Sequence, residues 1–283
     1  EESPVIFSPN KLDQEVWNFS MSNNDDLLEK IQHEKKYLID LCDGIYQGIA
    51  TGKDNVFLVD GNIILGHDIE RGILRPFLKG KNIRPYTIEW GGLYLIYPYD
   101  ENGNVISEQF FKSHYPNAYQ YMLDNKDNLK GRSYFDKSSK AWYELWNQRK
   151  PTRFEGEKIV TLDNASCNSF ALDINGFFGT TTVYSLKIIS DDGLNNKYVL
   201  GVLNSKLLNY YHRNTSVPQA GGFFRYQALF IKNLPIASAN ETIVNRISKC
   251  VTEILLGKKQ NADTTSLENQ IDFLVYHLYG LTY

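Results

Sequence analysis

The sequence predicts a mixed α/β (α+β) protein, in which a twisted, mixed β-sheet body is followed by a C-terminal helical hairpin. Short runs of β-branched and aromatic residues recur through the first 235 positions, which is typical of strands. Amphipathic stretches with helical spacing separate those runs. Two apolar stripes with helical spacing follow Pro235. The 283 residues are 42% hydrophobic, which is enough for a packed core.

The N-terminal part is predicted to contain a connector and one helix. Residues 1–24 hold two Ser-Pro pairs and an Asn-rich end, so we expect a connector there. Asp25 or Asp26 is suited to cap a helix that extends to about Cys42, with apolar side chains near one face. The pattern then becomes strand-like and punctuated by glycine up to Asp60.

The middle of the chain alternates between strands and helices. A helix is expected to begin at Pro116 and to end near Leu129, and a single amphipathic helix is expected at residues 197–211. Strands are expected at residues 93–97, 158–162, 169–173 and 181–189. Gly221 and Gly222 open a further strand-like run to Ile231.

The last part of the chain changes character after Pro235. Ile243, Ile247 and Ile254 share one helical face, and a second stripe extends from Leu267 to Leu278. Two antiparallel helices with facing stripes form a small helical module. We therefore expect a body at residues 25–235 and a helical hairpin module at residues 236–283.

Charge is distributed unevenly along the chain, although the net charge is only −3. Residues 1–70 hold 5 basic and 14 acidic side chains, whereas residues 75–153 hold 13 basic and 8 acidic ones. Residues 197–232 hold 5 basic side chains and no acidic one. Since contacts to phosphate need local positive charge, these two basic stretches keep nucleic acid open as a partner.

Several segments, taken in order, resemble the TaqI-like C-terminal specificity domain of restriction–modification enzymes. Residues 48–57 (Gly-Ile-Ala-Thr-Gly-Lys-Asp-Asn-Val-Phe) and 74–86 (Leu-Arg-Pro-Phe-Leu-Lys-Gly-Lys-Asn-Ile-Arg-Pro-Tyr) match family patterns, with Asn82 where the family often has Asp. Residues 200–206, 234–236 and 271–281 resemble later family segments. The resemblance covers about residues 44–281, while residues 99–115 and 163–182 match nothing in the family and are expected to carry sequence choice.

The resemblance implies a target recognition domain at residues 25–235, joined by the connector to a preceding methyltransferase domain. Such a domain binds double-stranded DNA in a sequence-specific way and positions the target adenine for N6 methylation by another domain. S-adenosylmethionine, and Mg²⁺ if the parent also contains a nuclease, are expected in other parts of the parent enzyme. We expect no cofactor or metal in this chain.

Basic and aromatic residues are the candidate DNA contacts. Arginine suits guanine in the major groove, Asn and Gln suit adenine, and Lys mostly binds phosphate. The alternative for each arginine is a structural ion pair. The candidates are Lys53, Arg75, Lys79, Lys81, Arg84, Tyr86, Arg132, Lys137, Arg153, Arg213, Gln219 and Arg225.

Catalysis by this chain is not predicted. The sequence has no Pro-Pro motif for binding an exocyclic amine and no Gly-rich cofactor loop after a strand. Two alternatives stay open: a magnesium-dependent nuclease segment, for which Asp100, Asp124 and Lys126 are the nearest approach, and a carbohydrate- or protein-binding module.

The remaining features indicate the compartment. Three dispersed cysteines give no disulfide framework and no zinc-ligand spacing. The sequence contains no signal peptide and no apolar run that could span a bilayer, so we expect a cytoplasmic protein without a membrane partner.

Overall fold

The computed structural model describes residues 25–33, 35–131, 137–189 and 193–281, and the predicted connector at residues 1–24 lies outside them. The helices are α1 (Asp25–Gln32), α2 (Asp54–Phe57), α3 (Gly61–Gly66), α4 (Glu108–His114), α5 (Pro116–Asp124), α6 (Asn196–Asn204), α7 (Lys206–Thr215), α8 (Ala228–Ile231), α9 (Glu241–Lys259) and α10 (Thr265–Leu278). The strands are β1 (Lys36–Tyr37), β2 (Cys42–Gln47), β3 (Leu58–Val59), β4 (Leu74–Leu78), β5 (Ile83–Arg84), β6 (Thr87–Ile88), β7 (Tyr94–Ile96), β8 (Lys158–Leu162), β9 (Asn164–Ala165), β10 (Phe170–Asp173), β11 (Phe178–Gly179), β12 (Val183–Ile188), β13 (Pro218–Gln219), β14 (Phe223–Arg225) and β15 (Pro235–Ile236). Short 3-10 helices connect several of them.

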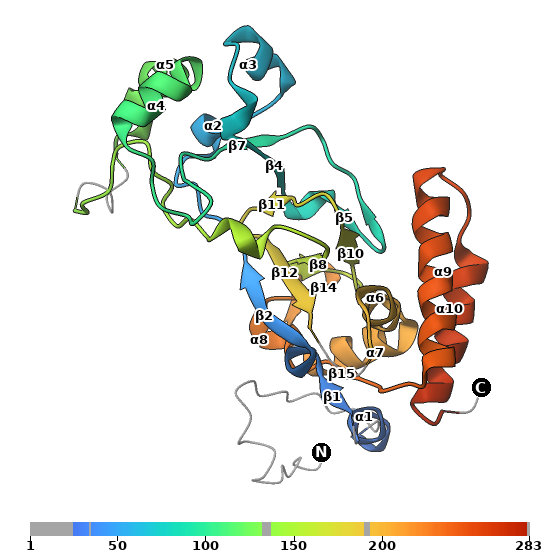
Figure 1. Cartoon of the computed structure of the whole chain (residues 1–283). Helices are drawn as coiled ribbons and strands as arrows, with labels where there is room; N and C mark the ends of the chain where they lie inside the picture. Colours follow the sequence, from blue (N-terminus) through green and yellow to red (C-terminus); the bar gives the residue numbers. More distant parts are fainter. Residues whose placement is uncertain (1–24, 34, 132–136, 190–192, 282–283) are drawn as a thin grey trace.

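An antiparallel sheet of order β10-β8-β12-β2 runs through the middle of the molecule (Figure 1). Side chains alternate along each strand, so the sheet has apolar residues on both faces. Ile159, Phe170 and Leu186 on one face belong to the core that includes α6. Val160 and Val183 on the other face pack in a smaller core. Both faces are therefore covered.

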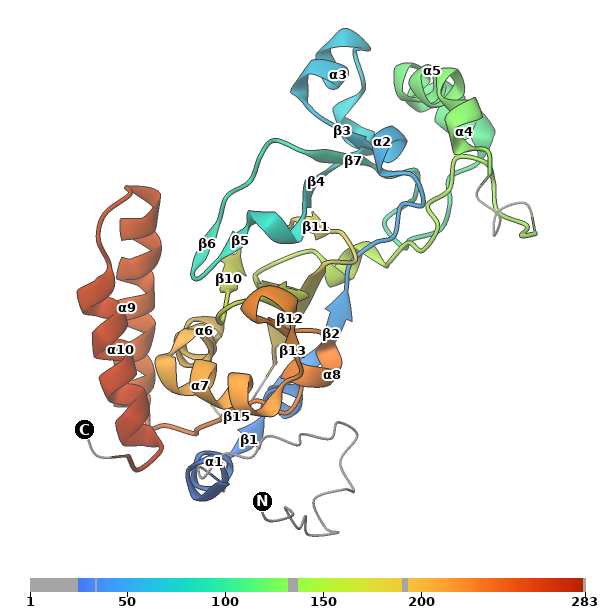
Figure 2. The same cartoon turned by 180° about the vertical axis from the view of Figure 1, so that it is seen from behind.

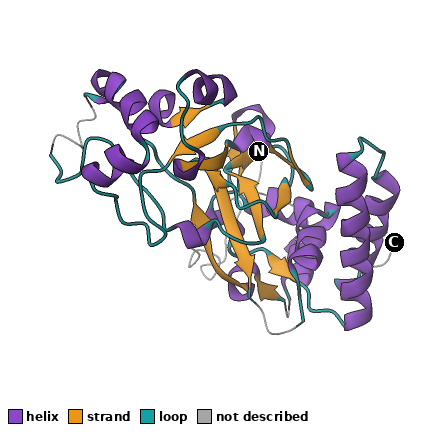
Figure 3. Cartoon of the chain, turned by 45° about the horizontal axis from the view of Figure 1, so that its top comes forward, coloured by secondary structure: helices purple, strands orange, loops and turns teal. Residues whose placement is uncertain are grey.

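A second sheet of order β11-β4-β7-β3 supports the part of the chain that carries α2 to α5 (Figure 1). Its β11–β4 pair is parallel, and its other pairs are antiparallel. The predicted mixed α/β class is thus confirmed, with the strands divided among several sheets. Figure 3 shows strands through the centre and helices on either side.

The C-terminal helical hairpin is confirmed as α9 and α10, which lie side by side and flank α6 (Figure 2). The buried residues Val244, Ile247 and Ile254 form the α9 stripe. Gly201 of α6 allows the close approach, because a Cβ there would lie 2.7 Å from Ile247 Cγ2. The hairpin shares the core of the body, and the boundary at residue 235 stays a prediction.

Two predicted helices differ in the structure. The first ends at Gln32, because residues 36–37 instead pair with β15 and place Leu38 in the core. The helix predicted at residues 197–211 is two helices that meet at Ser205, whose backbone is extended (φ −65°, ψ 154°). Its hydroxyl accepts a hydrogen bond from Leu208 N, so Ser205 begins α7 as an N-cap.

A buried ion pair between Lys158 and Asp173 closes one end of the central sheet. The two residues are directly opposite each other on β8 and β10, and their side chains are 1% and 0% exposed. Lys158 Nζ also donates to Phe154 O, while Asp173 accepts from the backbone N–H groups of Asn175 and Phe177. Burial lowers the pKa of Lys158, and the charge of Asp173 opposes that effect.

Candidate nucleic-acid interface

The opposite end of the central sheet forms a polar rim, made by Gln47, Asp163, Thr181 and Thr182. Residues 162 and 183 are cross-strand partners, as are residues 47 and 184, so β8 and β2 end where β12 begins. Gln47 Nε2 donates to Thr181 O over 2.9 Å. Asp163 N donates to Thr182 O over 3.0 Å. These hydrogen bonds tie three strand ends into one surface.

Predicted lysines lie beside this rim. The backbone N–H of Gly80 donates to Thr182 Oγ1 over 3.2 Å, which places residues 79–81 against the rim. Lys79 Nζ lies 3.3 Å from Asp54 Oδ2, and Lys81 is exposed. Lys53, half-buried, precedes Asp54 in the chain. Lys53 and Lys79 are therefore brought to one loop cluster from positions 26 residues apart.

A small antiparallel sheet of order β13-β14-β9 adjoins the rim, since β9 follows β8 with only Asp163 between them. Its inward face carries Phe224 and Ala165, which are 9% and 4% exposed and belong to the core. The alternation of side chains places Phe223 and Arg225 on the outward face, together with their cross-strand partners Gln219 and Asn164. Phe223 is 43% exposed.

Buried polar groups hold the Arg225 backbone from beneath. The carbonyl of Arg225 accepts from Ser216 Oγ and lies 2.9 Å from His212 Nε2, so this ring nitrogen carries the proton. The His212 side chain is fully buried, and burial lowers its pKa to about 4, opposed by that hydrogen bond. A neutral His212 therefore fixes β14 at neutral pH.

Asp163 is the rim residue next to the small sheet and provides the local negative charge. Burial raises the pKa of Asp163, whereas the hydrogen bond from Asn164 and the charge of Arg225 lower it. Tyr226 N donates to Asp163 O over 2.8 Å, which joins the end of β14 to the end of β8. Asp163, Asn164 and Arg225 are thus neighbours despite about sixty residues of intervening chain.

Arg213 lies on α7, next to the small sheet. Its guanidinium lies over the Phe224 ring, with 4.6 Å between Cζ and the ring centroid. One nitrogen donates to Ser166 O over 2.8 Å. Arg213 is exposed, so its charge remains accessible to an anion while it fixes the loop after β9.

Arg153 belongs to a second basic group beside the edge strand β2. Its guanidinium lies over the Tyr46 ring, with 4.4 Å between Cζ and the centroid. Arg149 Nε donates to Gln47 O over 3.3 Å, and Lys187 Nζ donates to Thr152 O over 2.7 Å. Burial, followed by the charge of Arg153, lowers the pKa of Arg149. The group extends the positive charge from β2 toward the rim.

The remaining predicted contacts have other surroundings in the structure. Arg75 donates to Gly72 O and Leu74 O, and Arg84 donates to two carbonyls of its own turn. Tyr86 is only 4% exposed and its backbone has φ 65°. Burial raises the pKa of its hydroxyl, and its ring packs in the core. Lys137 is exposed, and Arg132 lies outside the described residues.

Sequence reasoning missed Asn164 and Phe223 of the small sheet. Asn164 lies within residues 163–182, the segment that was expected to carry sequence choice. Phe223 follows Gly221 and Gly222, which have φ values of 75° and 78° and form the hairpin tip. Side chains alternate between the two faces of a strand. A strand starting directly after this glycine pair therefore puts Phe223 and Phe224 on opposite faces, and in the structure Phe223 is the exposed one.

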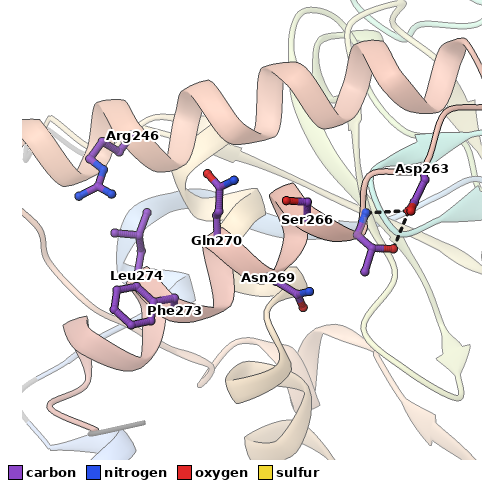
Figure 4. Close-up of a pocket in the computed structure, with 8 residues that line it drawn as sticks. Arg246, Asp263, Ser266, Asn269, Gln270, Phe273 and Leu274 are labelled. Atoms are coloured by element: carbon purple, nitrogen blue, oxygen red, sulfur yellow. Dashed lines mark hydrogen bonds between the residues drawn. The ribbon is translucent and has the colours of Figure 1, made fainter.

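A pocket of about 600 Å³ lies elsewhere, against α9 and α10 (Figure 4). Arg246 and Asp263 are charged residues of its lining, and Phe273 lies beside Leu274. None of the residues that line it is a predicted DNA contact.

Among the residues that the structure describes, none of the helices has the length and apolar character needed to span a bilayer.

Comparison with known proteins identifies the architecture. Residues 75–236, more than half of the chain, match the TaqI-like C-terminal specificity domain. The chain belongs to this family. The type IIL restriction-modification enzyme MmeI, solved in complex with DNA, has a similar fold, with a TM-score of 0.62 and 12% identity. The match covers 88% of this chain and 34% of MmeI.

Two curated relatives of this specificity domain are type II methyltransferases. M.MjaIV of Methanocaldococcus jannaschii is 28% identical, over 81% of this chain and 76% of its own length. M.BstVI of Geobacillus stearothermophilus is 20% identical, over 95% of this chain. The match spans only 46% of M.BstVI, so much of that relative lies beyond the part shared with this chain.

Proposed function

We propose that this specificity domain recognises a short sequence in duplex DNA and positions the target adenine for N6 methylation. Where the parent protein also contains a nuclease, the same binding positions the DNA for cleavage. Family membership favours this function over a nuclease segment or a carbohydrate- or protein-binding module. In the nuclease alternative, Asp100 is one of the carboxylates. Its side chain accepts hydrogen bonds from Asn102 N and Asn104 N and so stabilises its own turn.

One observation carries the proposal: side chains suited to bases and side chains suited to phosphates are neighbours at one end of the central sheet. Gln219, Arg225 and Asn164 lie on the small sheet, and Lys79 and Lys81 lie beside the adjoining rim. Arginine, Asn and Gln match base edges in the major groove, while lysines fix the position of the protein on phosphates.

The proposed partners and cofactors follow from the same function. Double-stranded DNA is the ligand, and a methyltransferase domain of the same protein or complex carries out the transfer. S-adenosylmethionine then belongs to that domain, and Mg²⁺ belongs to a nuclease domain where one is present. The proposed compartment is the cytoplasm, where a prokaryotic cell holds its DNA.

Selection from a randomised duplex pool, at two salt concentrations, tests the proposed function. We expect enrichment of one short motif and an affinity that falls as salt rises, because bound lysines and arginines release counterions from DNA. Binding with no sequence preference would contradict recognition. Salt-insensitive binding to a glycan, with none to DNA, would favour the binding-module alternative.

A further inference from the structure

The outward side chains on the small sheet lie close enough together to reach adjacent or nearby base pairs. Directly opposite residues on antiparallel strands have Cβ atoms about 4.5–5.5 Å apart. Residues i and i+2 on one strand lie about 6.7 Å apart. Base pairs stack about 3.4 Å apart along each strand. The partners Arg225 and Asn164 therefore suit neighbouring base pairs, and Phe223 suits one two steps from Arg225.

The small sheet also has the shape that a groove requires. The major groove accepts a two-stranded β-ribbon. Strand β14 pairs with β13 across a glycine tip and with β9 on its other side. A Cβ built on Gly222 would meet no described atom within 4 Å, so the tip lies in open space. Phe223, at the start of β14, is 43% exposed at this tip.

The Arg225 side chain is accessible while its backbone is fixed. Among the described residues, the Arg225 guanidinium has no hydrogen bond or ion pair within bonding distance, and Asp163 acts on it only through charge. The Arg225 carbonyl, in contrast, is held by His212 and Ser216. A guanidinium without a partner on a fixed strand is suited to bidentate binding, since little conformational freedom is lost when its planar group binds a ligand.

Resting on the proposed function, we propose that the outward face of β13-β14-β9 enters the major groove and reads two adjacent base pairs. Arg225 binds N7 and O6 of a guanine, and Asn164 binds N7 and N6 of an adenine, which are the bidentate pairings of these side chains. Phe223 and Gln219 face the base pairs on one side of this step. Asn164 and Phe223 are thus specificity-determining residues, and the target contains a guanine and an adenine at adjacent positions of the duplex.

Motif selection with variants of the complete protein tests this assignment. The wild type is compared with Arg225→Ala and Asn164→Ala. Arg246→Ala and Asn245→Ala are matched controls, because both residues are exposed on α9. We expect each test variant to lose preference at one position, by about 5- to 150-fold, and the two positions to be neighbours. The controls should select the wild-type motif.

The outcomes separate this assignment from the proposed function. If the wild type selects a motif but the two variants broaden distant positions, or only weaken all sequences equally, the small sheet does not read adjacent base pairs. If the wild type selects no motif, the proposed function fails and the assignment fails with it. Arg225→Lys serves as a second variant that keeps the charge, and it should weaken the guanine preference less than Arg225→Ala does, because an ammonium can still donate to guanine but lacks the planar fork. Circular dichroism of each variant confirms that it is folded.

Discussion

The polar groups at the two ends of β8 differ in burial and in pairing. At its first residue, Lys158 is buried against Asp173, and hydrogen bonds engage both partners. Beyond its last residue, Asp163 and Asn164 are half-buried beside Arg225, and the Arg225 guanidinium makes no ion pair with the described residues. We call the end at Lys158 and Asp173 the closed end, and the end at Asp163, Asn164 and Arg225 the open end. The two ends lie only a few residues apart along the chain.

This difference teaches where to look for binding in a chain rich in charges. A cation with a buried, hydrogen-bonded partner has its interactions satisfied within the fold, so removing it changes stability. A half-exposed cation on a fixed backbone has donors left for a ligand. The closed end is expected to govern folding, and the open end is expected to govern recognition.

The largest expected effect comes from breaking the closed end. Lys158→Met leaves the Asp173 carboxylate buried without its charged partner, so the free energy of unfolding should fall by about 3–5 kcal/mol. Urea unfolding measures this loss. A second change, Asp173→Leu, should recover part of it by removing the stranded charge. A single variant as stable as the wild type would show that the ion pair does not secure this end.

Acid should weaken the support beneath the open end. His212 has a folded pKa of about 4, below its ordinary value near 6.5, so the unfolded chain takes up a proton first. Stability is unaffected by this group above about pH 6.5, and falls by as much as about 3 kcal/mol as pH drops to about 4.

Urea unfolding of the wild type and of His212→Gln, followed from pH 7 to pH 4, isolates this contribution. The variant lacks the titrating ring, so its stability should decline less steeply over that window. Parallel decline of the two proteins would contradict the role of a neutral His212. Motif selection at neutral pH provides a second readout, because a shifted Arg225 backbone should also relax the guanine preference.

A smaller effect is expected at the rim. Lys79→Gln removes one phosphate-binding charge, so the slope of log affinity against log salt should become shallower by about one, with the motif unchanged. Its ion pair with Asp54 is well exposed and contributes little to stability. Binding titrations at several salt concentrations measure the slope. An altered motif would instead make Lys79 a base-reading residue.

The smallest effect is expected for Arg84→Ala. The Arg84 fork donates to the carbonyls of Lys81 and Ile83 and lies 3.5 Å from exposed Glu89. Its loss should change stability by less than about 0.5 kcal/mol and leave the selected motif intact. Loss of preference at one base position would show that Arg84 leaves its own turn when DNA binds.

Elements whose signal is local could be predicted from the sequence. The stripe of Ile247 and Ile254 predicts α9, because apolar residues at helical spacing over a few turns indicate the buried face of a helix. Strand β8 matches the predicted residues 158–162, since its β-branched core residues are contiguous. Arg225 and Gln219 could be proposed as DNA contacts from residue type alone.

Features that depend on distant partners could not be predicted. Tyr86 N donates to Phe170 O, and this contact across 84 residues places an apparently exposed tyrosine in the core. Leu38 leaves the predicted helix because residues 36–37 pair with β15. The neighbouring positions of Asn164 and Arg225 follow from strand pairing, which no local pattern records.

The inward and outward faces of the small sheet are under separate constraints. Phe224 and Ala165 are tied to the core and resist change, because substitutions there leave cavities or strain. Gln219, Asn164, Phe223 and Arg225 alternate with them on the same backbone and can vary at little cost in stability. With the proposed assignment, a lineage changes its DNA target by substitutions on the outward face alone, and a library of these four positions is the place to select new specificities.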